Sequence, residues 1–300
     1  AAGLVPARAA PGPDAPVAAA LGDFGAALLR QSKANNASRA PVAAATALGL
    51  VQAGANGAAE REIEALLGPG RAGAAAFRHE LPQLVRQVQG GDGATQGGPG
   101  SSPLNGPLTM AAHMWVDQAA AAAVPAAYSR RLQQRWQAGA TRLSFAQPEP
   151  AREQINAWTA LHTGGKVAEL LPSGSLHPGT QAVLTTAMHF KSPWQRPFTP
   201  DKTEPRPFKT AGGDSKPVPT MVDERGVMQA QIDGQLVMEL PFAQGYSLLL
   251  AVPAEGAAVT PGGEQLGRWR QALKPLKCEL ALPRFAIAPQ AASLKTALQV

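Results

Sequence analysis

The chain has 300 residues, 45% of them hydrophobic and 16% charged, and carries a formal net charge of +6. This composition is typical of a globular protein, and the length predicts one or two domains with a buried core. No apolar run is long enough to cross a bilayer, and a single cysteine excludes an internal disulfide. The basic residues are scattered and lack an accompanying series of aromatic residues, so neither a membrane nor a nucleic acid is expected as a partner.

The first half of the chain is predicted to be mostly helical. Residues 1–13 (AAGLVPARAAPGP) are predicted to form a disordered lead-in, and apolar residues recur at helical spacing from Asp14 onward. Pro41 and Pro125 can each open a helix, because the first turn does not use the N–H that proline lacks. The expected helices run from Asp14 to about Leu28, Pro41 to about Gly54, Ala59 to Leu67, Phe77 to Val88, Pro125 to Trp136 and Ile155 to Leu161.

Strand patterns dominate the second half, after a first strand at Leu108–Val116, where every second residue from Leu108 to Val116 is apolar. Residues 182–190 (AVLTTAMHF) are apolar or small on both faces, which predicts a strand buried on both sides. Residues 189–208 hold five prolines and are predicted to be a connector, neither a regular helix nor a central strand. The remaining elements are strands at Val227–Ile232, Leu236–Leu240, Tyr246–Val252 and Glu279–Ile287, and helices at Glu264–Leu273 and Ala292–Leu298.

Helices first and strands later, without regular alternation, predict an α+β fold. The sequence offers no catalytic constellation. Its five histidines lie in no metal-ligand spacing, Ser247 lacks the second glycine of a nucleophile elbow, and Cys278 has no partner that would mark a nucleophile. His189 is interpreted as a packed histidine of its strand. We therefore expect no enzyme activity, no bound metal and no cofactor.

Several motifs along the chain match one family. FKSPWQRPF at 190–198, followed by VPTM at 218–221, resembles the serpin stretch F-K-G-x-W-x-x-x-F and V-P-M-M. MELPF at 238–242 resembles L-E-L-P-Y, and LPRFAI at 282–287 resembles L-P-K-F-x-I. INAWTALHTGGKVAELL at 155–171 is similar to I-N-x-W-V-x-x-x-T-x-G-K-I-x-x-L-L. Order and spacing hold from about Asp14 to Leu298, so nearly the whole chain resembles a serpin.

The resemblance implies a single α+β domain over residues 14–300, with helices and mixed or antiparallel sheets. It implies an extracellular or periplasmic inhibitor of serine proteases, or sometimes cysteine proteases, whose metastable native state acts as a suicide substrate. Its reactive loop is cleaved and then inserts into the main sheet as a new strand. By the same resemblance the loop lies beyond Val300, which leaves the domain incomplete at its C-terminus. The alternative is a non-inhibitory, serpin-like binding protein.

The resemblance also assigns candidate site residues. The S-P-x-S that opens the second serpin helix reads Ala40-Pro41-Val42-Ala43, so both hydroxyls of the sheet-gating cluster are replaced. The N-A of the buried strand reads Thr186-Ala187. Trp194 matches the tryptophan where the inserting loop enters the sheet. With the following strand beyond Val300, one edge of residues 182–190 is expected to be bare, so the fragment is expected to self-associate.

Overall fold

The computed structural model describes residues 16–32, 36–67, 70–88, 106–120, 124–210, 212–253 and 259–287. These residues group into two units, one within residues 40–191 and the other combining residues up to 39 with those from 192 onward. Both helices and sheets occur, in agreement with the predicted α+β class. The single domain 14–300 stays a prediction, and the lead-in at 1–13 and the helix at 292–298 lie outside the described residues.

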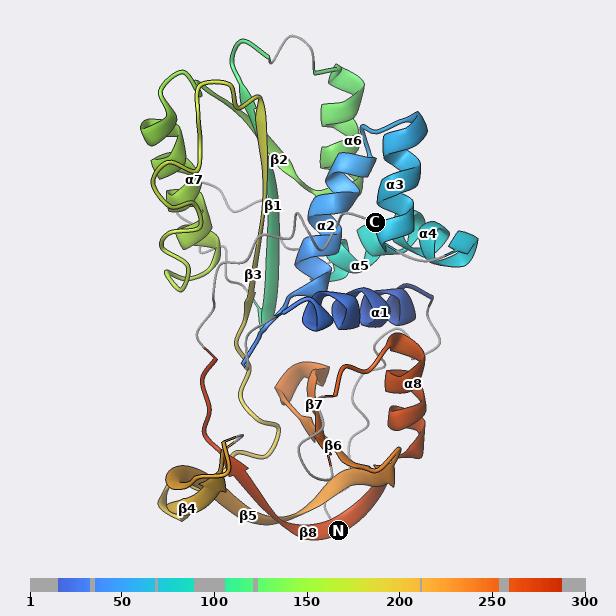
Figure 1. The fold of residues 1–300 in the computed structure, drawn as a ribbon, viewed down its shortest axis with the longest axis vertical. Helices are drawn as coiled ribbons and strands as arrows, with labels where there is room; N and C mark the ends of the chain where they lie inside the picture. Colours follow the sequence, from blue (N-terminus) through green and yellow to red (C-terminus); the bar gives the residue numbers. More distant parts are fainter. Residues whose placement is uncertain are drawn as a thin grey trace. The chain divides into compact units, whose positions relative to one another are not determined.

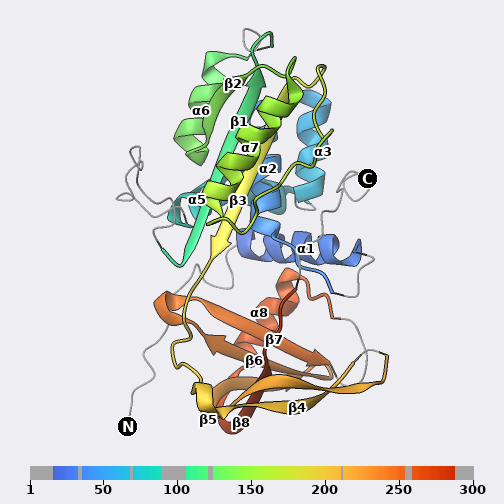
Figure 2. The ribbon, with the colours of Figure 1, turned by 90° about the vertical axis from the view of Figure 1, so that its left-hand side faces the viewer.

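The unit within residues 40–191 contains a three-stranded sheet of order β2-β1-β3. The central strand β1 (Leu108–Asp117) runs parallel to β2 (Gly139–Leu143) and antiparallel to β3 (Ala182–Phe190). Helix α7 covers one face of this sheet and α2 packs on the other, as Figure 1 and Figure 2 show. The helices of this unit are α2 (Pro41–Gln52), α3 (Gly57–Leu67), α4 (Gly70–His79), α5 (Leu81–Val88), α6 (Ala126–Trp136) and α7 (Pro148–His162).

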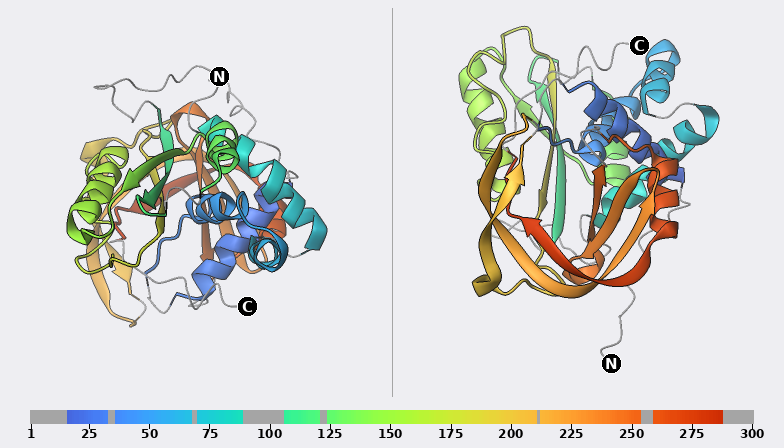
Figure 3. Two further views of the ribbon diagram at one scale, coloured as in Figure 1. Left: turned by 90° about the horizontal axis from the view of Figure 1, so that it is seen from above. Right: turned by 60° about the horizontal axis from the view of Figure 1, so that its bottom comes forward.

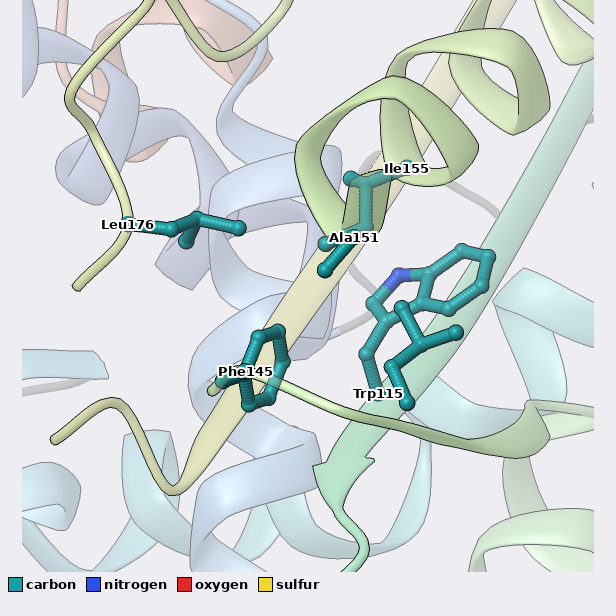
Figure 4. Packing of buried hydrophobic residues seen from close by; sticks show 6 residues of the cluster. Trp115, Phe145, Ala151, Ile155 and Leu176 are labelled. Carbon is teal, nitrogen blue, oxygen red and sulfur yellow. The ribbon is translucent and has the colours of Figure 1, made fainter. Parts of the chain in front are cut away.

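Helix α7 is held on the sheet by a buried apolar cluster (Figure 4). Trp115 of β1 and Phe145 after β2 meet Ala151 and Ile155, which lie one turn apart on α7. Leu176, from the segment that follows α7, closes the cluster. Phe145 and Ile155 are fully buried. Each such side chain stabilises the fold by about 1.5–3 kcal/mol relative to an exposed one.

The other unit is built on an antiparallel sheet in which the long strand β5 is shared. The sheet order is β4-β5-β6-β7, and β8 also pairs with β5. Figure 3 shows β5 (gold to orange) and β8 (red) curving together along most of their length. The strands are β4 (Thr203–Lys209), β5 (Ser215–Ile232), β6 (Gln235–Pro241), β7 (Ser247–Pro253) and β8 (Lys274–Pro283).

Two helices of this unit, α1 (Pro16–Arg30) and α8 (Gly263–Ala272), pack against each other at close range. A Cβ at Gly263 would lie 2.0 Å from the Ala19 carbonyl oxygen, so this approach requires glycine. Asp23 Oδ1 accepts a hydrogen bond from the Gly263 N–H over 2.8 Å, which satisfies one of the free donors at the start of α8. On the sheet side, the indole of Trp269 is fully buried beside Val237.

The helices predicted to begin near residues 14, 41, 59 and 125 are confirmed, as are the strands at 108–116 and 236–240. The predicted helix at 77–88 is wrong, because two helices, α4 and α5, meet at Glu80. Pro82 has no N–H to give to the Arg78 carbonyl four residues earlier, and that carbonyl instead accepts from Arg135 Nη2.

The proline-rich connector was predicted to be neither a regular helix nor a central strand, and its second half forms β4, a strand at the end of the sheet. Pro205 and Pro207 lie opposite Pro219 and Pro217 of β5. In an antiparallel pair, two directly opposite residues either exchange backbone hydrogen bonds with each other or form none. When both residues are prolines, no other residue of the two strands therefore loses a hydrogen-bond partner in this pair. β4 also ends the sheet, where proline is tolerated.

Other boundaries were predicted wrongly. β2 was missed, because four of its five residues are exposed and show no apolar alternation. β5 begins at Ser215 instead of Val227, and β8 begins at Lys274 and ends at Pro283. β3 has the predicted bounds, but it is buried mainly at its centre, and Phe190 is 41% exposed.

Candidate functional site

Strand β3 is tied to a different neighbour on each of its faces. Thr186 Oγ1 donates to the Ala43 carbonyl of α2 over 3.1 Å. Its neighbour Thr185 faces the other side, where Oγ1 accepts from Trp115 Nε1 over 3.0 Å. Successive side chains of a strand alternate between faces, so adjacent threonines can bond in opposite directions. Thr185 is fully buried and Thr186 half-buried.

The start of α2 has no side-chain cap. Ala40, the residue before the helix, has φ −115° and ψ 81°, and Pro41 occupies the first helical position. Thr46, one turn further on, donates to the Val42 carbonyl over 2.8 Å and is fully buried. The structure therefore brings Ala43 and Thr186 together, while positions 40 and 43 supply no hydroxyl to this contact.

Trp194 belongs to the other unit, where its indole stacks on Phe242 with ring centroids 4.3 Å apart and planes inclined by 12°. The two residues also form an isolated antiparallel bridge. Phe198 meets the indole edge-on, with centroids 6.0 Å apart. Backbone bonds reinforce the contact, since Gln195 N–H donates to the Pro241 carbonyl over 2.9 Å. The first half of the proline-rich stretch is thus anchored beside the end of β6.

A buried arginine supports this turn. Arg225 of β5 is 7% exposed, and its guanidinium carbon lies 4.0 Å from the centroid of the Phe198 ring. Its Nε donates to Asp223 Oδ2 over 2.9 Å, and its Nη1 donates to the Arg196 carbonyl over 2.9 Å. Sequence reasoning missed Arg225 because charged residues in strands usually face solvent. Phe242 ends the MELPF motif, but no local pattern indicated its stacking partner.

No arrangement typical of metal binding was found in the described ranges, where no three His, Cys, Asp or Glu side chains gather. Within the same ranges, no helix is long and apolar enough to span a membrane. His189 and Cys278 are half-buried, and Cys278 packs at the margin of the cluster around Leu280.

The sequence model described as Serpin (serine protease inhibitor) matches residues 19–300. The chain belongs to the serpin family. It is 29% identical to Serpin-Z7 of Hordeum vulgare over 229 residues, which cover 74% of this chain and 55% of that protein. It is 28% identical to Serpin-Z2B of Triticum aestivum over 274 residues, 86% of this chain and 65% of the relative. This serpin chain therefore spans about half to two thirds of the length of these relatives.

A third relative, 31% identical over 170 residues, is the probable non-inhibitory serpin-Z5 of Arabidopsis thaliana, with 55% of this chain and 37% of that protein covered. Among solved structures, Cleaved Serpin 42Da superposes with a TM-score of 0.79 at 21% identity, covering 96% of this chain and 76% of that one. A thyroxine-binding globulin complex with thyroxine superposes at 0.77 and 20% identity, covering 94% and 76%. The sequence model confirms the predicted family, and the solved structures confirm the predicted α+β fold.

Proposed function

We propose that this serpin, with its reactive loop, inhibits serine proteases by inserting the cleaved loop into the sheet β2-β1-β3. The observation that carries the proposal is the pairing of β3. One edge is fully paired to β1, from Leu108 opposite Phe190 to Val116 opposite Ala182, and no described strand pairs with the other edge. An extended segment can add to such an edge through main-chain hydrogen bonds. Cysteine proteases are a secondary target class, and the inhibitor acts outside the cytoplasm.

In this proposal the contact between α2 and β3 gates the sheet. The hydroxyl of Thr186 bonds to Ala43, which opposes movement of β3 away from α2. One neutral hydrogen bond contributes about 0.5–1.5 kcal/mol, so the gate depends largely on packing. Trp194 marks the place where the loop enters, and its stacking on Phe242 keeps that turn rigid. The native state is metastable, and the added strand releases the stored free energy.

The test compares this chain with a longer protein that carries the proposed reactive loop after Val300. The longer protein is incubated with a panel of serine and cysteine proteases, and denaturing gels are read for a complex that survives SDS. We expect such a band with at least one serine protease and none with the 300-residue chain, which serves as the matched control. Cleavage of the longer protein without any stable complex would contradict the proposal. A stable complex formed by the shorter chain would also contradict it.

A second candidate is a non-inhibitory binding protein. Alanine at positions 40 and 43 favours it, because the sheet gate then lacks two hydroxyls. The likeness to the probable non-inhibitory serpin-Z5 and to thyroxine-binding globulin also supports it. The two candidates differ after cleavage of the loop. Insertion would raise the unfolding temperature of the cleaved longer protein, whereas a binding protein that cannot insert its loop would show no rise.

A further inference from the structure

A row of alternating imidazole and indole rings lies between α7 and the sheet. The His113 ring of β1 lies 4.3 Å from the Trp115 ring and 5.5 Å from the Trp158 ring of α7. Trp158 in turn lies 4.2 Å from His162, in the last turn of α7. His162 Nδ1 is 2.8 Å from the Trp158 carbonyl oxygen, which fixes the position of this ring. Two titratable rings therefore border the indole that joins the C-terminal half of α7 to β1.

The fold makes room for His113 across strand β2. His113 lies opposite Gly139, and a Cβ at Gly139 would be 2.6 Å from both Cε1 and Nδ1 of the imidazole. Beyond the glycine, His113 Nε2 forms a 2.9 Å hydrogen bond with Thr141 Oγ1. The backbone of Gly139 is not left-handed, so glycine is needed here for space alone. Glycine and threonine on β2 thus seat one histidine.

The surroundings of His113 disfavour its charged form. Burial is the main cause that lowers the pKa of His113, to about 4, and the positive charge of His162 lowers it further. No ion pair or hydrogen bond joins either imidazole to a carboxylate in the part of the chain that the structure describes. Asp117 instead accepts the backbone N–H groups of Phe145 and Ala119. The other charged or titratable groups on the packed elements are Arg142 on β2, Glu149, Arg152 and Glu153 on α7, Lys166 and Glu169 after it, and His189 on β3.

These groups do not offset a charge on the histidine. Glu149 and Glu169 both pair with Arg152, over 2.7 and 3.2 Å. Glu153, Arg142 and Lys166 are exposed. A protonated His113 would therefore lie half-buried beside His162 without a counter-charge. Release of α7 would hydrate both rings. The free energy of the protonated imidazole is lower in water than in this packed site, so protonation favours release.

We propose that His113, Trp158 and His162 form a pH-sensitive clasp that holds the C-terminal half of α7 on strands β1 and β2 and loosens in mild acid. The clasp is independent of the reactive loop. The apolar contacts of Ala151 and Ile155 keep the N-terminal half of α7 in place. Acid would therefore expose the Trp158 side of this contact without unfolding the unit.

The sign follows from proton linkage. A histidine whose folded pKa is depressed stabilises the packed state above its unfolded pKa of 6.5, and this stability is lost as the pH falls toward the folded value of about 4. Little change is expected above about pH 7. Between about pH 7.5 and about pH 5, opening of the C-terminal half of α7 should become on the order of tenfold more frequent.

Hydrogen exchange of the α7 amides, corrected for the intrinsic effect of pH, measures this opening. In the 300-residue chain, protection of residues 156–162 should fall on the order of tenfold over that range. In the variant His113→Gln, whose amide can still reach Thr141 but does not titrate, protection should change less than about twofold. Gly139→Ala should weaken protection at both pH values, because its Cβ occupies the place of the imidazole.

His177→Gln is the matched control, since His177 is an exposed histidine in the same unit. It should behave like the unsubstituted chain. If His113→Gln fails to fold, His113→Phe keeps an aromatic ring in the row and removes the titrating group. The proposal is overturned if the unsubstituted chain shows no fall in protection. It is equally overturned if the non-titrating variant falls as far as the parent.

Discussion

Replacing Ala40 by serine should stabilise this serpin through the start of α2. Ala40 occupies the N-cap position with no side-chain hydrogen bond, and Pro41 follows at the first helical position. A serine hydroxyl there can accept the backbone N–H of Val42 or Ala43, donors that the helix itself leaves free. Exchanging alanine for serine at an N-cap contributes about 1 kcal/mol. For a chain of 300 residues that gain raises the unfolding temperature by roughly 1.5–2 °C.

The start of α7 offers a matched comparison. Gln147 has φ −115° and ψ 82°, against −115° and 81° for Ala40, and it also precedes a helical proline. Pro150 at the third helical position has no N–H, so Gln147→Ser can cap Glu149 alone. We therefore expect a smaller gain from Gln147→Ser. A gain at Ala40 that shrinks when Thr186→Val is added would show that the new hydroxyl also acts on the contact with β3.

Urea unfolding followed by far-UV circular dichroism measures the effect, with hydrogen exchange of α2 as a local readout. The Ala40→Ser midpoint should rise while the denaturant slope stays constant, because the surface exposed on unfolding is unchanged. An unchanged or lower midpoint would refute the reasoning. It would mean that the backbone before α2 cannot present a side-chain oxygen to the first turn.

Three further predictions concern the same unit. Thr186→Val should lower the free energy of unfolding by about 0.5–1.5 kcal/mol, because it removes the hydrogen bond to Ala43. Thr109→Val should lower it less, since the Thr109 hydroxyl lies 3.5 Å from its acceptor, the His189 carbonyl oxygen. Equal losses in urea unfolding would contradict this prediction. No described strand pairs with the outer edge of residues 182–190, so the 300-residue chain should self-associate, and a peptide copying the proposed reactive-loop strand should suppress this association. A monodisperse monomer in light scattering would contradict this prediction. The N–H groups of Phe145 and then Ala119 hold the pKa of Asp117 below its usual value, so its contribution is present at neutral pH and lost as the pH falls through the folded pKa. Asp117→Asn should therefore lower the urea midpoint near neutral pH and have less effect in acid, and an equal effect at both would show that the charge is irrelevant.

Local sequence patterns were sufficient for the helices that carry their own signals. Pro41 opens α2, and the spacing of Leu132 and Trp136 places α6. The strand β1 could also be predicted locally, because successive side chains of a strand point to opposite faces of its sheet and give a period of two residues. The prediction failed for elements whose structure depends on residues far away in the chain, such as the helix predicted at residues 77–88. Pro82 accounts for the break between α4 and α5, because it cannot donate a hydrogen bond to the Arg78 carbonyl. That carbonyl accepts instead from Arg135 of another helix, which the local sequence does not indicate.

The candidate site divides in the same way. The motif match alone named Thr186 and Trp194 as candidates, because family motifs keep their order and spacing. It did not show that Thr186 bonds to a carbonyl of α2, or that Trp194 stacks on Phe242. Arg225 carried no signal at all, since its burial depends on a ring contributed by residue 198.

The sequence by itself therefore determined the family, the α+β class and the helices whose first turns and periodicity are local properties. Tertiary structure decided which strands pair and which side chains meet. β4 is a strand because β5 lies beside it, and β2 is a strand because β1 lies beside it. The physical reason is that strand hydrogen bonds join residues far apart in the chain. A strand's stability depends on a partner that no short stretch of sequence can specify.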